Sequence, residues 1–388
     1  MMRSICIVGA SLAGLRGAEE IRRQGFEGRM TLIGAEAQFP PFDRPPLSKA
    51  VLASTWTLEQ ARLPVFEDLD AAIHLGVAAT DLDLAARCVR VQGGTSVPFD
   101  GLMIATGTEV IRLRCPGADL PGVRYLRSAD DASLLLARIS RRPRVAVIGA
   151  GFIGSEIASV CRERGLEVTL IDSSPLPLEP QVGRLVASYI FQQHRDRGVA
   201  TRFGASVTSI EGDSDVTGVT LSGGDTIAAD LVVVGIGVRP AVGWLSGSGL
   251  DISDGVLCDE ECRAIGADGV VAAGDVARWQ NPAYGRAMRI EHWTNAVEQS
   301  EYAARSLLGV QEGPFRSIPY FWSDQFTMHL QCAGVRGDTD EVVEGSMATG
   351  AFVIESRVDD RVVGVLASNS VNRFQKARRA LAAARAHS

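Results

Sequence analysis

Residues 144–172 read RVAVIGAGFIGSEIASVCRERGLEVTLID and decide the fold. Val145–Ile148 is a short apolar run of β-forming residues, which is typical of a strand buried on both faces. Gly149, Gly151 and Gly154 then form a complete G-x-G-x-x-G motif. The first glycine allows a tight turn, the second lets the backbone approach a pyrophosphate, and the third lets the following helix pack closely on the strand. This order predicts a nucleotide-binding unit.

A second strand and an acidic residue complete the unit. Residues 168–171 are apolar and β-forming, and Asp172 follows directly, placed to hydrogen-bond the ribose of an adenosine. A chance glycine-rich turn is the alternative. The agreement among both strands, the helix and the terminal acid favours a dinucleotide-binding fold.

The same pattern occurs near the start of the chain. Residues 5–8 form an apolar run that ends at Gly9, and Gly14 follows in the expected helix. Residues 30–34 form the next expected strand, and Glu36 follows it. This segment predicts a second nucleotide-binding unit.

Two such units imply two dinucleotides. Their first glycines, Gly9 and Gly149, are 140 residues apart, which is too far for one cofactor fold to use both. A chain that binds two dinucleotides is most simply a flavin enzyme reduced by a nicotinamide, so a flavin and a nicotinamide dinucleotide are the expected cofactors. Ser11 occupies the position where a glycine would approach the pyrophosphate, and the sequence leaves open whether it weakens FAD binding.

The composition is that of a globular protein with several domains. The 388 residues are 46% hydrophobic and 22% charged, enough for two or three substantial cores. A net charge of −7 gives no reason to expect nucleic acid or an anionic membrane as partner. No apolar run approaches the roughly 18 residues of a membrane span. The first strand begins too early to leave room for a signal peptide, so we expect a cytoplasmic protein.

The cysteines do not suggest a disulfide framework or a metal site. The seven are scattered and odd in number, and no zinc or iron–sulfur spacing occurs. Cys258 and Cys262 are the only close pair. They are either redox-active or two incidental thiols.

A proline-rich segment, FPPFDRPPLSK, occupies residues 39–49. Its prolines exclude regular helix and sheet. It is either a surface segment or docking ligand, or a rigid connection that projects Arg44 and Lys49 into a site. Only Lys49 and Lys376 are lysines among 39 basic residues, which suggests a need for a compact charge.

Small-residue turns and one acid mark the expected ligand edge of the sheets. One strand runs into Ala105-Thr-Gly107, and a near-copy runs into Gly235-Ile-Gly237, where backbone can pass close to a cofactor. A third apolar strand ends in Asp275, at the edge where doubly wound folds bind ligands. A helix cap is the alternative role for this aspartate.

The motif order predicts an α/β fold with two Rossmann-like domains, the second inserted in the first, and a small C-terminal α+β domain. The expected domains are an FAD-binding domain of residues 1–113 and 237–313, an NADH-binding domain of residues 114–236, and a C-terminal domain of residues 314–388. Further elements are expected as a helix near 182–197, a helix that begins with Thr294 or Asn295 near its cap, and strands at 328–333, 352–356 and 361–366.

The whole chain resembles the NADH-dependent ferredoxin reductases that serve cytochrome P450s and ring-hydroxylating dioxygenases. Members of that family have a glutathione-reductase-like architecture. The resemblance implies electron transfer from NADH through FAD to an iron–sulfur ferredoxin, of the [2Fe-2S] or [3Fe-4S] kind, that feeds a P450 or a dioxygenase. It rests on RPPLSK at 44–49, GAGFIGSE at 149–156, AGD at 273–275, EHWTNA at 291–296 and FWSDQ at 321–325.

The resemblance also implies site residues. Lys49, paired with Glu156, and Trp322 are the expected catalytic residues beside the flavin. The expected cofactor-binding residues are Gly9, Ser11, Leu12, Ala13, Gly14, Ala35, Glu36, Arg44, Lys49, Ala79, Ala105, Thr106, Gly107, Arg127, Gly149, Gly151, Phe152, Ile153, Gly154, Glu156, Asp172, Gly235, Gly237, Gly274, Asp275, Glu291, His292, Trp293 and Trp322.

Cofactor choice and rival activities follow from the same residues. Asp172 predicts NADH over NADPH, because a 2′-phosphate would meet its carboxylate and no arginine follows before Arg184. An NADH oxidase or peroxidase is one rival, but it needs a cysteine against the flavin, and residues 43–51 contain none. A rubredoxin-type reductase and a flavin-loaded sensing protein are the other rivals.

Overall fold

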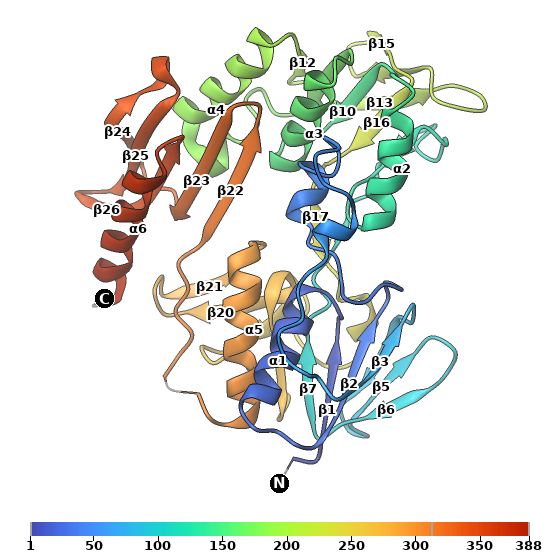
Figure 1. Ribbon diagram of the computed structural model, residues 1–388, viewed down its shortest axis with the longest axis vertical. Coiled ribbons are helices and arrows are strands. Elements are labelled where there is room, and N and C mark those ends of the chain that lie inside the picture. The colour runs from blue at the N-terminus through green and yellow to red at the C-terminus, as the bar shows by residue number, and fades with distance from the viewer. Residues whose placement is uncertain (1, 312, 387–388) are drawn as a thin grey trace.

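The computed structural model describes residues 2–311 and 313–386, and three units in it are each built on a five-stranded sheet (Figure 1). In the first unit, α1 (Leu12–Arg23) and α5 (Trp293–Leu308) pack against each other and cover one face of a parallel sheet. The strand order of that sheet is β19 (Val270–Ala272), β7 (Gly101–Ile104), β1 (Ser4–Val8), β2 (Arg29–Gly34) and β3 (Ala71–Leu75).

The second unit repeats the parallel arrangement and contains the decisive glycine motif. The motif lies between β10 (Val145–Ile148) and α3 (Phe152–Glu163), where the sequence predicts it. The other helices are α2 (Ala129–Ile139) and α4 (Glu179–Asp196). The strand order is β12 (Ala200–Phe203), β11 (Val168–Asp172), β10, β16 (Leu231–Val234) and β9 (Val123–Arg124).

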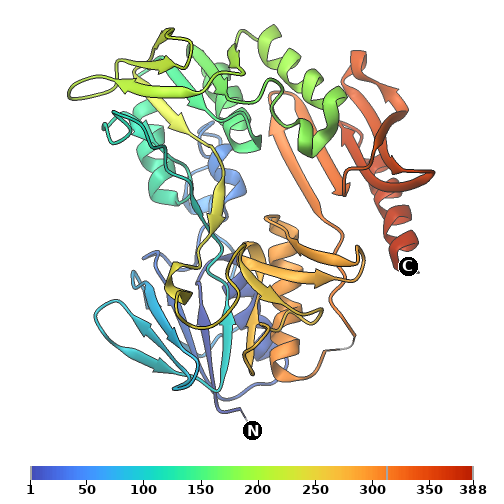
Figure 2. The same ribbon diagram turned by 180° about the vertical axis from the view of Figure 1, so that it is seen from behind.

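The chain enters and leaves the second unit through two paired segments. Strand β8 (Thr108–Val110) follows the last outgoing segment of the first unit, and β17 (Val238–Pro240) returns from the second. They form an antiparallel pair, visible as adjacent connections between the two large sheets in Figure 2. The pairing supports the proposed insertion near residues 113 and 237.

Three small sheets and five short 3₁₀ helices complete the part of the chain that the structure describes, and one of these helices lies in the C-terminal unit. The small sheets are β4 (Ala79–Asp83), β5 (Cys88–Val91) and β6 (Ser96–Pro98); β13 (Val207–Glu211), β14 (Gly218–Leu221) and β15 (Thr226–Ala228); and β18 (Val256–Cys258), β20 (Ala277–Asn281) and β21 (Arg286–Arg289). The 3₁₀ helices are η1 (Pro45–Ser48), η2 (Glu59–Ala61), η3 (Gly243–Leu245), η4 (Gly274–Val276) and η5 (Met347–Thr349).

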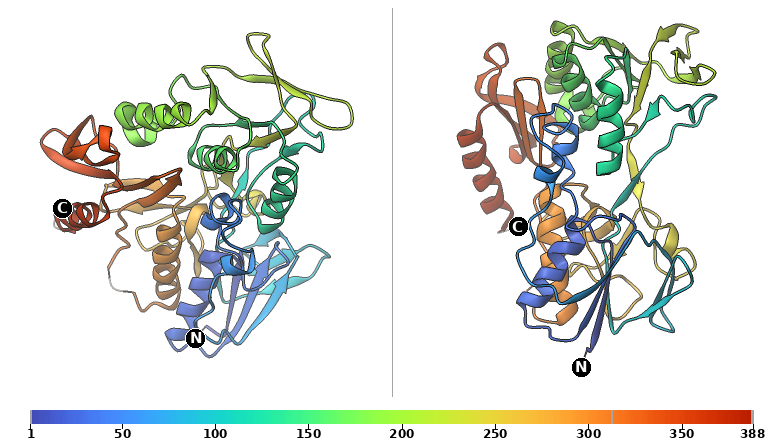
Figure 3. Two further views of the ribbon diagram at one scale, coloured as in Figure 1. Left: turned by 45° about the horizontal axis from the view of Figure 1, so that its top comes forward. Right: turned by 45° about the vertical axis from the view of Figure 1, so that its right-hand side comes forward.

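The C-terminal unit is an antiparallel sheet with one helix on its outer side. Helix α6 (Val371–Ala386) packs on this sheet at the outside of the molecule (Figure 3). The strand order is β22 (Tyr320–Gln325), β23 (Met328–Gly334), β26 (Arg361–Ser368), β25 (Ala351–Val358) and β24 (Thr339–Ser346).

The structure contains two strands that the sequence did not predict, and it defines the starts of two predicted helices. Strands β22 and β24 were not expected, because β22 carries polar side chains that point into the interior and β24 is almost wholly exposed. Helix α4 spans Glu179–Asp196, but Gly183 inside it has non-helical backbone angles, so the regular helix follows this kink and agrees with the helix predicted near residues 182–197. Helix α5 begins at Trp293 with His292 as its N-cap, so Thr294 and Asn295 lie in the first turn, near the cap as predicted.

The proline-rich segment is a rigid, buried connection. Its η1 turn places Leu47 in the interior, and Val51 and Leu52 follow it there. These side chains belong to one apolar cluster with the second unit and with strands of the C-terminal unit, among them Leu330 of β23. The surface and docking-ligand interpretations are therefore wrong. Burial of the segment fixes the position of Lys49, which follows η1 directly.

A buried histidine in α4 makes stability depend on pH. His194 is fully buried, and burial lowers its pKa to about 4. As the pH falls from about 6.5 toward 4, the unfolded chain binds a proton that the folded chain refuses, so stability decreases. Between pH 7 and pH 5 we expect this residue to account for a loss of about 2 kcal/mol in the free energy of unfolding.

Urea denaturation at the two pH values checks this expectation. Whatever its effect on stability at pH 7, His194→Gln should reduce the loss in the free energy of unfolding between pH 7 and pH 5 by about 2 kcal/mol. An unchanged difference between pH 7 and pH 5 would contradict the assignment.

Candidate active site

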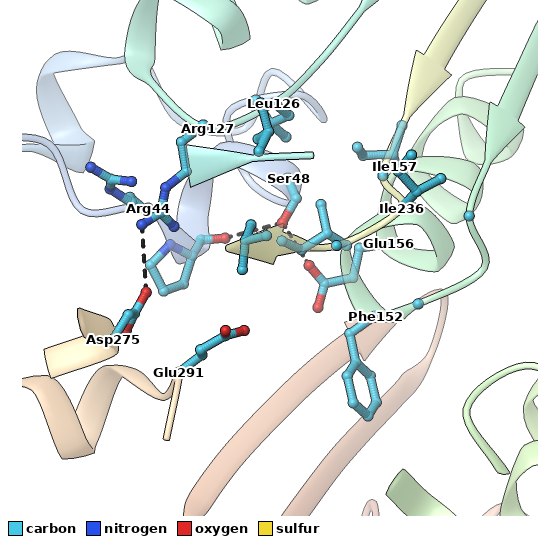
Figure 4. Close-up of a pocket in the computed structure, with 18 of the residues that line it drawn as sticks. Arg44, Ser48, Leu126, Arg127, Phe152, Glu156, Ile157, Ile236, Asp275 and Glu291 are labelled. Atoms are coloured by element: carbon cyan, nitrogen blue, oxygen red, sulfur yellow. Dashed lines mark hydrogen bonds and ion pairs between the residues drawn. The ribbon is translucent and has the colours of Figure 1, made fainter. Parts of the chain in front are cut away.

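One cavity of about 1010 Å³ lies among the three units. Residues from both glycine turns line it, together with Lys49 of the proline-rich segment and Trp322 of β22. Figure 4 shows part of the lining, with Arg127 and Asp275 on one side and Ser48 and Glu156 farther along. The cavity is continuous from the first unit to the second, so ligands bound to the two units would meet inside it.

Three helices begin at this cavity without a side-chain cap. The N-caps of α1, α3 and α5 are Ser11, Gly151 and His292, and none of them accepts a hydrogen bond through its side chain. By contrast, Ser128 forms a complete capping box at α2. Free amides and the helix dipole make an uncapped N-terminus a binding site for phosphates and other anions. Three helix N-termini that suit anionic groups thus face one cavity.

The two glycine turns have the same backbone geometry. Gly9 has a φ of +116°, and a Cβ there would lie 2.1 Å from the carbonyl oxygen of Ala105. Gly149 has a φ of +99°, and a Cβ there would lie 2.2 Å from that of Gly235. Only glycine fits either position. Ser11 has a φ of −96°, which any residue adopts, so the serine brings no backbone strain.

A polar cluster lines the first unit's side of the cavity. Asp275 Oδ2 accepts a hydrogen bond from Thr108 Oγ1 at 3.1 Å and lies 3.5 Å from Arg127 Nη2. Burial lowers the pKa of Arg127 to about 10, which still leaves the guanidinium charged at neutral pH. Arg44 Nη2 donates to Glu36 Oε1 at 2.8 Å. The cluster presents both donors and acceptors to a ligand.

Lys49 forms the expected ion pair with Glu156 of α3. Its Nζ lies 2.8 Å from Glu156 Oε2, and the Lys49 side chain is 18% exposed while that of Glu156 is 3% exposed. Ser48 Oγ donates to the same oxygen at 2.6 Å, and Ser323 Oγ donates to Oε1 at 2.6 Å. The ammonium is thus held at the cavity wall by a buried carboxylate.

Two tryptophans stand together at the same end of the cavity. Trp293 and Trp322 meet edge to face, with ring centroids 6.4 Å apart. The Trp293 indole donates to Asp43 Oδ1 at 2.8 Å. Burial nevertheless raises the pKa of Asp43. The bond to Asp43 fixes the Trp293 ring at the first turn of α5.

Asp172 ends β11 at the cavity and is already hydrogen-bonded to backbone. Its Oδ2 accepts from the Ala150 amide at 2.8 Å, and its Oδ1 accepts from the Ser174 amide at 2.8 Å. The carboxylate therefore joins the glycine turn to the loop after β11. It stands fixed where an adenosine ribose is expected.

Two buried polar atoms of the lining have no partner. Arg44 Nη1 and His292 Nδ1 are both buried without a hydrogen bond. Burial also lowers the pKa of His292 to about 4, so this imidazole is neutral at physiological pH. Such atoms are costly unless a ligand satisfies them. The lining therefore fits a polar, anionic ligand.

Most of the residues predicted for the site line the cavity, and six do not. Gly9 lies in the turn after β1, Gly14 and Gly154 lie in the first turns of α1 and α3, and the other three follow or begin strands of the first unit. Those lining it are Ser11, Leu12, Ala13, Arg44, Lys49, Ala105, Thr106, Gly107, Arg127, Gly149, Gly151, Phe152, Ile153, Glu156, Asp172, Gly235, Gly237, Gly274, Asp275, Glu291, His292, Trp293 and Trp322. Those absent from the lining are Gly9, Gly14, Ala35, Glu36, Ala79 and Gly154.

Sequence reasoning missed several polar residues of the site. Ser48 and Asp43 lie in the proline-rich segment, next to the predicted site residues Lys49 and Arg44. Ser323 lies in the FWSDQ motif. Their proximity to motif residues was the available signal. Their contacts depend on elements far apart in sequence.

The cysteines lie away from the cavity. All seven are free, and none is among the lining residues. Cys258 and Cys262 are fully buried, and burial raises the pKa of each thiol well above its ordinary value. Reactive thiols need the opposite environment. The pair is therefore structural, and the cysteine that the NADH oxidase or peroxidase rival needs is absent from the residues that line the cavity.

Two features are absent from the part of the chain that the structure describes. No helix within residues 2–311 and 313–386 has the length and apolar content to cross a membrane. No three or more His, Cys, Asp or Glu side chains in those ranges are grouped to hold a metal ion.

Comparisons with known proteins agree along the whole chain. Residues 3–300 match the family described as pyridine nucleotide-disulphide oxidoreductase, and residues 320–388 match the reductase C-terminal family. Rhodocoxin reductase from Rhodococcus erythropolis is 36% identical over 384 residues, which is 98% of this chain and 89% of the relative.

Solved structures give the same result. The ferredoxin reductase for the CYP199A2 system from Rhodopseudomonas palustris is 33% identical, with a TM-score of 0.91 over 96% of this chain and 92% of that one. The reductase in the covalent putidaredoxin reductase–putidaredoxin complex is 31% identical, with a TM-score of 0.93 over 98% and 93% of the two chains.

Proposed function

We propose that this chain passes electrons from NADH through FAD to an iron–sulfur ferredoxin. The chain belongs to the pyridine nucleotide-disulphide oxidoreductase family and is a ferredoxin–NAD(P) reductase of the kind that serves P450 and dioxygenase systems. The observation that carries the proposal is the single cavity at which three helices begin uncapped. Two pyrophosphates and an anionic ring edge need three such sites.

The first unit is proposed to hold FAD. Its pyrophosphate would lie at Ser11 and the first turn of α1, and the polar cluster of Arg127 and Asp275 would bind the ribityl chain. The N-terminus of α5 at Trp293 would face the ring. The unpartnered atoms of Arg44 and His292 fit this assignment, since bound FAD offers them acceptors and donors.

The second unit is proposed to hold NADH. Its pyrophosphate would lie at Gly151 and the first turn of α3, and Asp172 would accept the ribose hydroxyls. The domains are proposed as residues 1–113 with 237–313, residues 114–236, and residues 314–388. A cytoplasmic location also stays a prediction.

FAD held in the first unit would supply hydride acceptance from the nicotinamide and single-electron transfer to the protein partner. The protein's own part is positioning and electrostatics. Two fixed nucleotide sites bring the rings together in one orientation. Lys49 supplies a positive charge at the cavity wall, and Glu156 keeps the ammonium in place.

Gly151→Ala is expected to weaken NADH binding, whereas Gly154→Ala is expected to lower the stability of the fold. No atom lies within 4 Å of a Cβ at Gly151, so the methyl group would occupy the cavity and weaken NADH binding, with an unchanged free energy of unfolding. A Cβ at Gly154 would lie 1.9 Å from the Gly149 carbonyl oxygen. This clash should lower stability by about 1–3 kcal/mol despite the better helix propensity of alanine.

Urea denaturation and titration with NADH measure the two effects. Equal stability losses in both variants would contradict the assigned roles of the two glycines.

One assay tests the proposed function. The purified protein is loaded with FAD and supplied with NADH, and reduction is followed across a panel of [2Fe-2S] ferredoxins, [3Fe-4S] ferredoxins and rubredoxins. Rapid reduction of a ferredoxin is the expected result. A protein that binds no FAD, or one that NADH reduces only slowly and no ferredoxin accelerates, would overturn the proposal. Reduction of rubredoxin alone would reassign the partner.

A further inference from the structure

Glu156 is held by two different parts of the molecule. It is 2% exposed. Its Oε2 accepts from Ser48 and Lys49, which belong to the first unit, at 2.6 and 2.8 Å. Its Oε1 accepts at 2.6 Å from Ser323, which belongs to β22 of the C-terminal unit. The carboxylate that holds Lys49 is therefore itself oriented from the C-terminal sheet.

A buried hydrogen-bond chain continues behind Ser323. Gln325 Nε2 donates to Ser323 Oγ at 3.1 Å, and His194 Nε2 lies 3.0 Å from Gln325 Oε1. All three residues are 0% exposed. Ser323 and Gln325 are two residues apart on one strand, so their side chains leave the same face. We refer to Ser323, Gln325 and His194 as the donor chain.

The direction of every hydrogen bond in the donor chain follows from the Glu156 carboxylate, at which the chain ends. An ionised carboxylate only accepts, so the single hydroxyl hydrogen of Ser323 goes to Glu156. Ser323 Oγ then accepts from the amide NH₂ of Gln325, whose oxygen accepts from His194. His194 must therefore carry its proton on Nε2. Burial lowers the pKa of His194 to about 4, which agrees with a neutral ring.

Packing alone gives no reason for this arrangement. Buried polar side chains are costly unless fully paired, and apolar residues of similar volume would serve the core equally well. His194 Nδ1 has no hydrogen-bond partner in the described structure, so the chain is not fully satisfied at its far end. Its satisfied end is Glu156. All three donors are thus aligned toward one carboxylate at the cavity.

We propose that Ser323, supported by Gln325 and His194, is a positioning residue that fixes Glu156 and thereby sets the place of the Lys49 ammonium in the active site. The proposal rests on the proposed function for its kinetic consequence. Its structural content, that Ser323 controls Lys49, does not require turnover. The C-terminal unit is then part of the hydride-transfer site.

The chain's lysine content gives a direct measurement. Lys49 and Lys376 are its only lysines, and Lys376 is exposed on α6. Protein labelled with [ε-¹³C]lysine therefore has two lysine side-chain signals, one from the site and one internal reference. Ser323→Ala should move the Lys49 signal toward that of Lys376 and leave the Lys376 signal in place. An unmoved Lys49 signal would overturn the proposal.

Rapid-reaction kinetics supply the second measurement. In the FAD-loaded protein, Ser323→Ala should lower the limiting rate of flavin reduction about tenfold, the size of a lost hydrogen bond to a charged group. The NADH concentration at half-maximal rate should stay the same. Gln325→Leu, one link farther from Glu156, should have a smaller effect of the same kind. It also serves as the test if Ser323→Ala fails to fold.

A double-mutant cycle separates positioning from general damage. In a Glu156→Gln background, Ser323→Ala should change the rate less than twofold. An undiminished tenfold loss would show that Ser323 does not act through Glu156. Ser368→Ala is the matched control, because Ser368 is also fully buried in this sheet but donates to the Gly350 carbonyl oxygen. It should leave rate and Lys49 signal unchanged.

The lysine signals and the rate of flavin reduction distinguish a failure of the proposed function from a failure of the positioning role. If NADH does not reduce the loaded protein, the proposed function is wrong, and the lysine signals still report whether Ser323 controls Lys49. If NADH reduces it and neither the signal nor the rate responds to Ser323→Ala, only the positioning role is wrong.

Discussion

Lys49→Met should slow the reduction of the bound flavin by NADH by about 100-fold, the usual loss when one charge-stabilising group is removed from a buried site. The ammonium stands at the cavity wall, 2.8 Å from Glu156, and methionine keeps the length of the side chain without its charge. Stopped-flow measurement of flavin absorbance gives the rate. A wild-type trace would remove Lys49 from the mechanism.

The same substitution should also destabilise the protein. It leaves Glu156 buried with two serine donors but no opposite charge, which costs about 3–5 kcal/mol. Adding Glu156→Gln should restore much of that stability without restoring the rate. Lys376→Met is the control, because Lys376 is exposed on α6 and should affect neither quantity.

The wild-type protein should prefer NADH to NADPH by about 100-fold in catalytic efficiency, since a 2′-phosphate placed against a carboxylate costs several kcal/mol. Asp172→Asn is the informative variant. It keeps the size of the side chain and one oxygen for the backbone amides, but it removes the charge. We expect it to lose efficiency with NADH and gain with NADPH, so that the ratio falls toward ten or less.

Steady-state kinetics with both nucleotides measure this ratio. Equal efficiency of the wild-type protein with NADH and NADPH would refute the role of Asp172. An Asp172→Asn variant that loses activity equally with both would mean that the residue only supports the loop, through its bonds to Ala150 and Ser174.

The glycine turns and their strands were predictable because their causes are local. Gly149 needs a positive φ that other residues adopt only under strain, and the apolar runs on either side of it need no distant partner to be recognised. Strand β22, at the edge of the C-terminal sheet, was missed for the opposite reason. Its buried positions carry Ser323 and Gln325, whose partners lie in other elements.

The candidate site was predictable only as a set of residues. Lys49 and Glu156 were paired through a family resemblance, and their ion pair is present. Whether Cys258 and Cys262 are reactive was open in the sequence, and the buried surroundings of both thiols decide it. The start of α5 was predicted near Thr294 and Asn295, but only the structure showed that its N-cap is His292 and that this side chain makes no capping hydrogen bond.

By itself the sequence determined two nucleotide-binding units, their order along the chain and the acid that ends β11, since each depends on residues that are neighbours in the chain. The tertiary structure alone decided that the two units open into one cavity and that Ser323 reaches Glu156 from 167 residues away. A hydrogen bond between such distant groups exists only where packing brings their elements together. No local pattern of residue types encodes that approach.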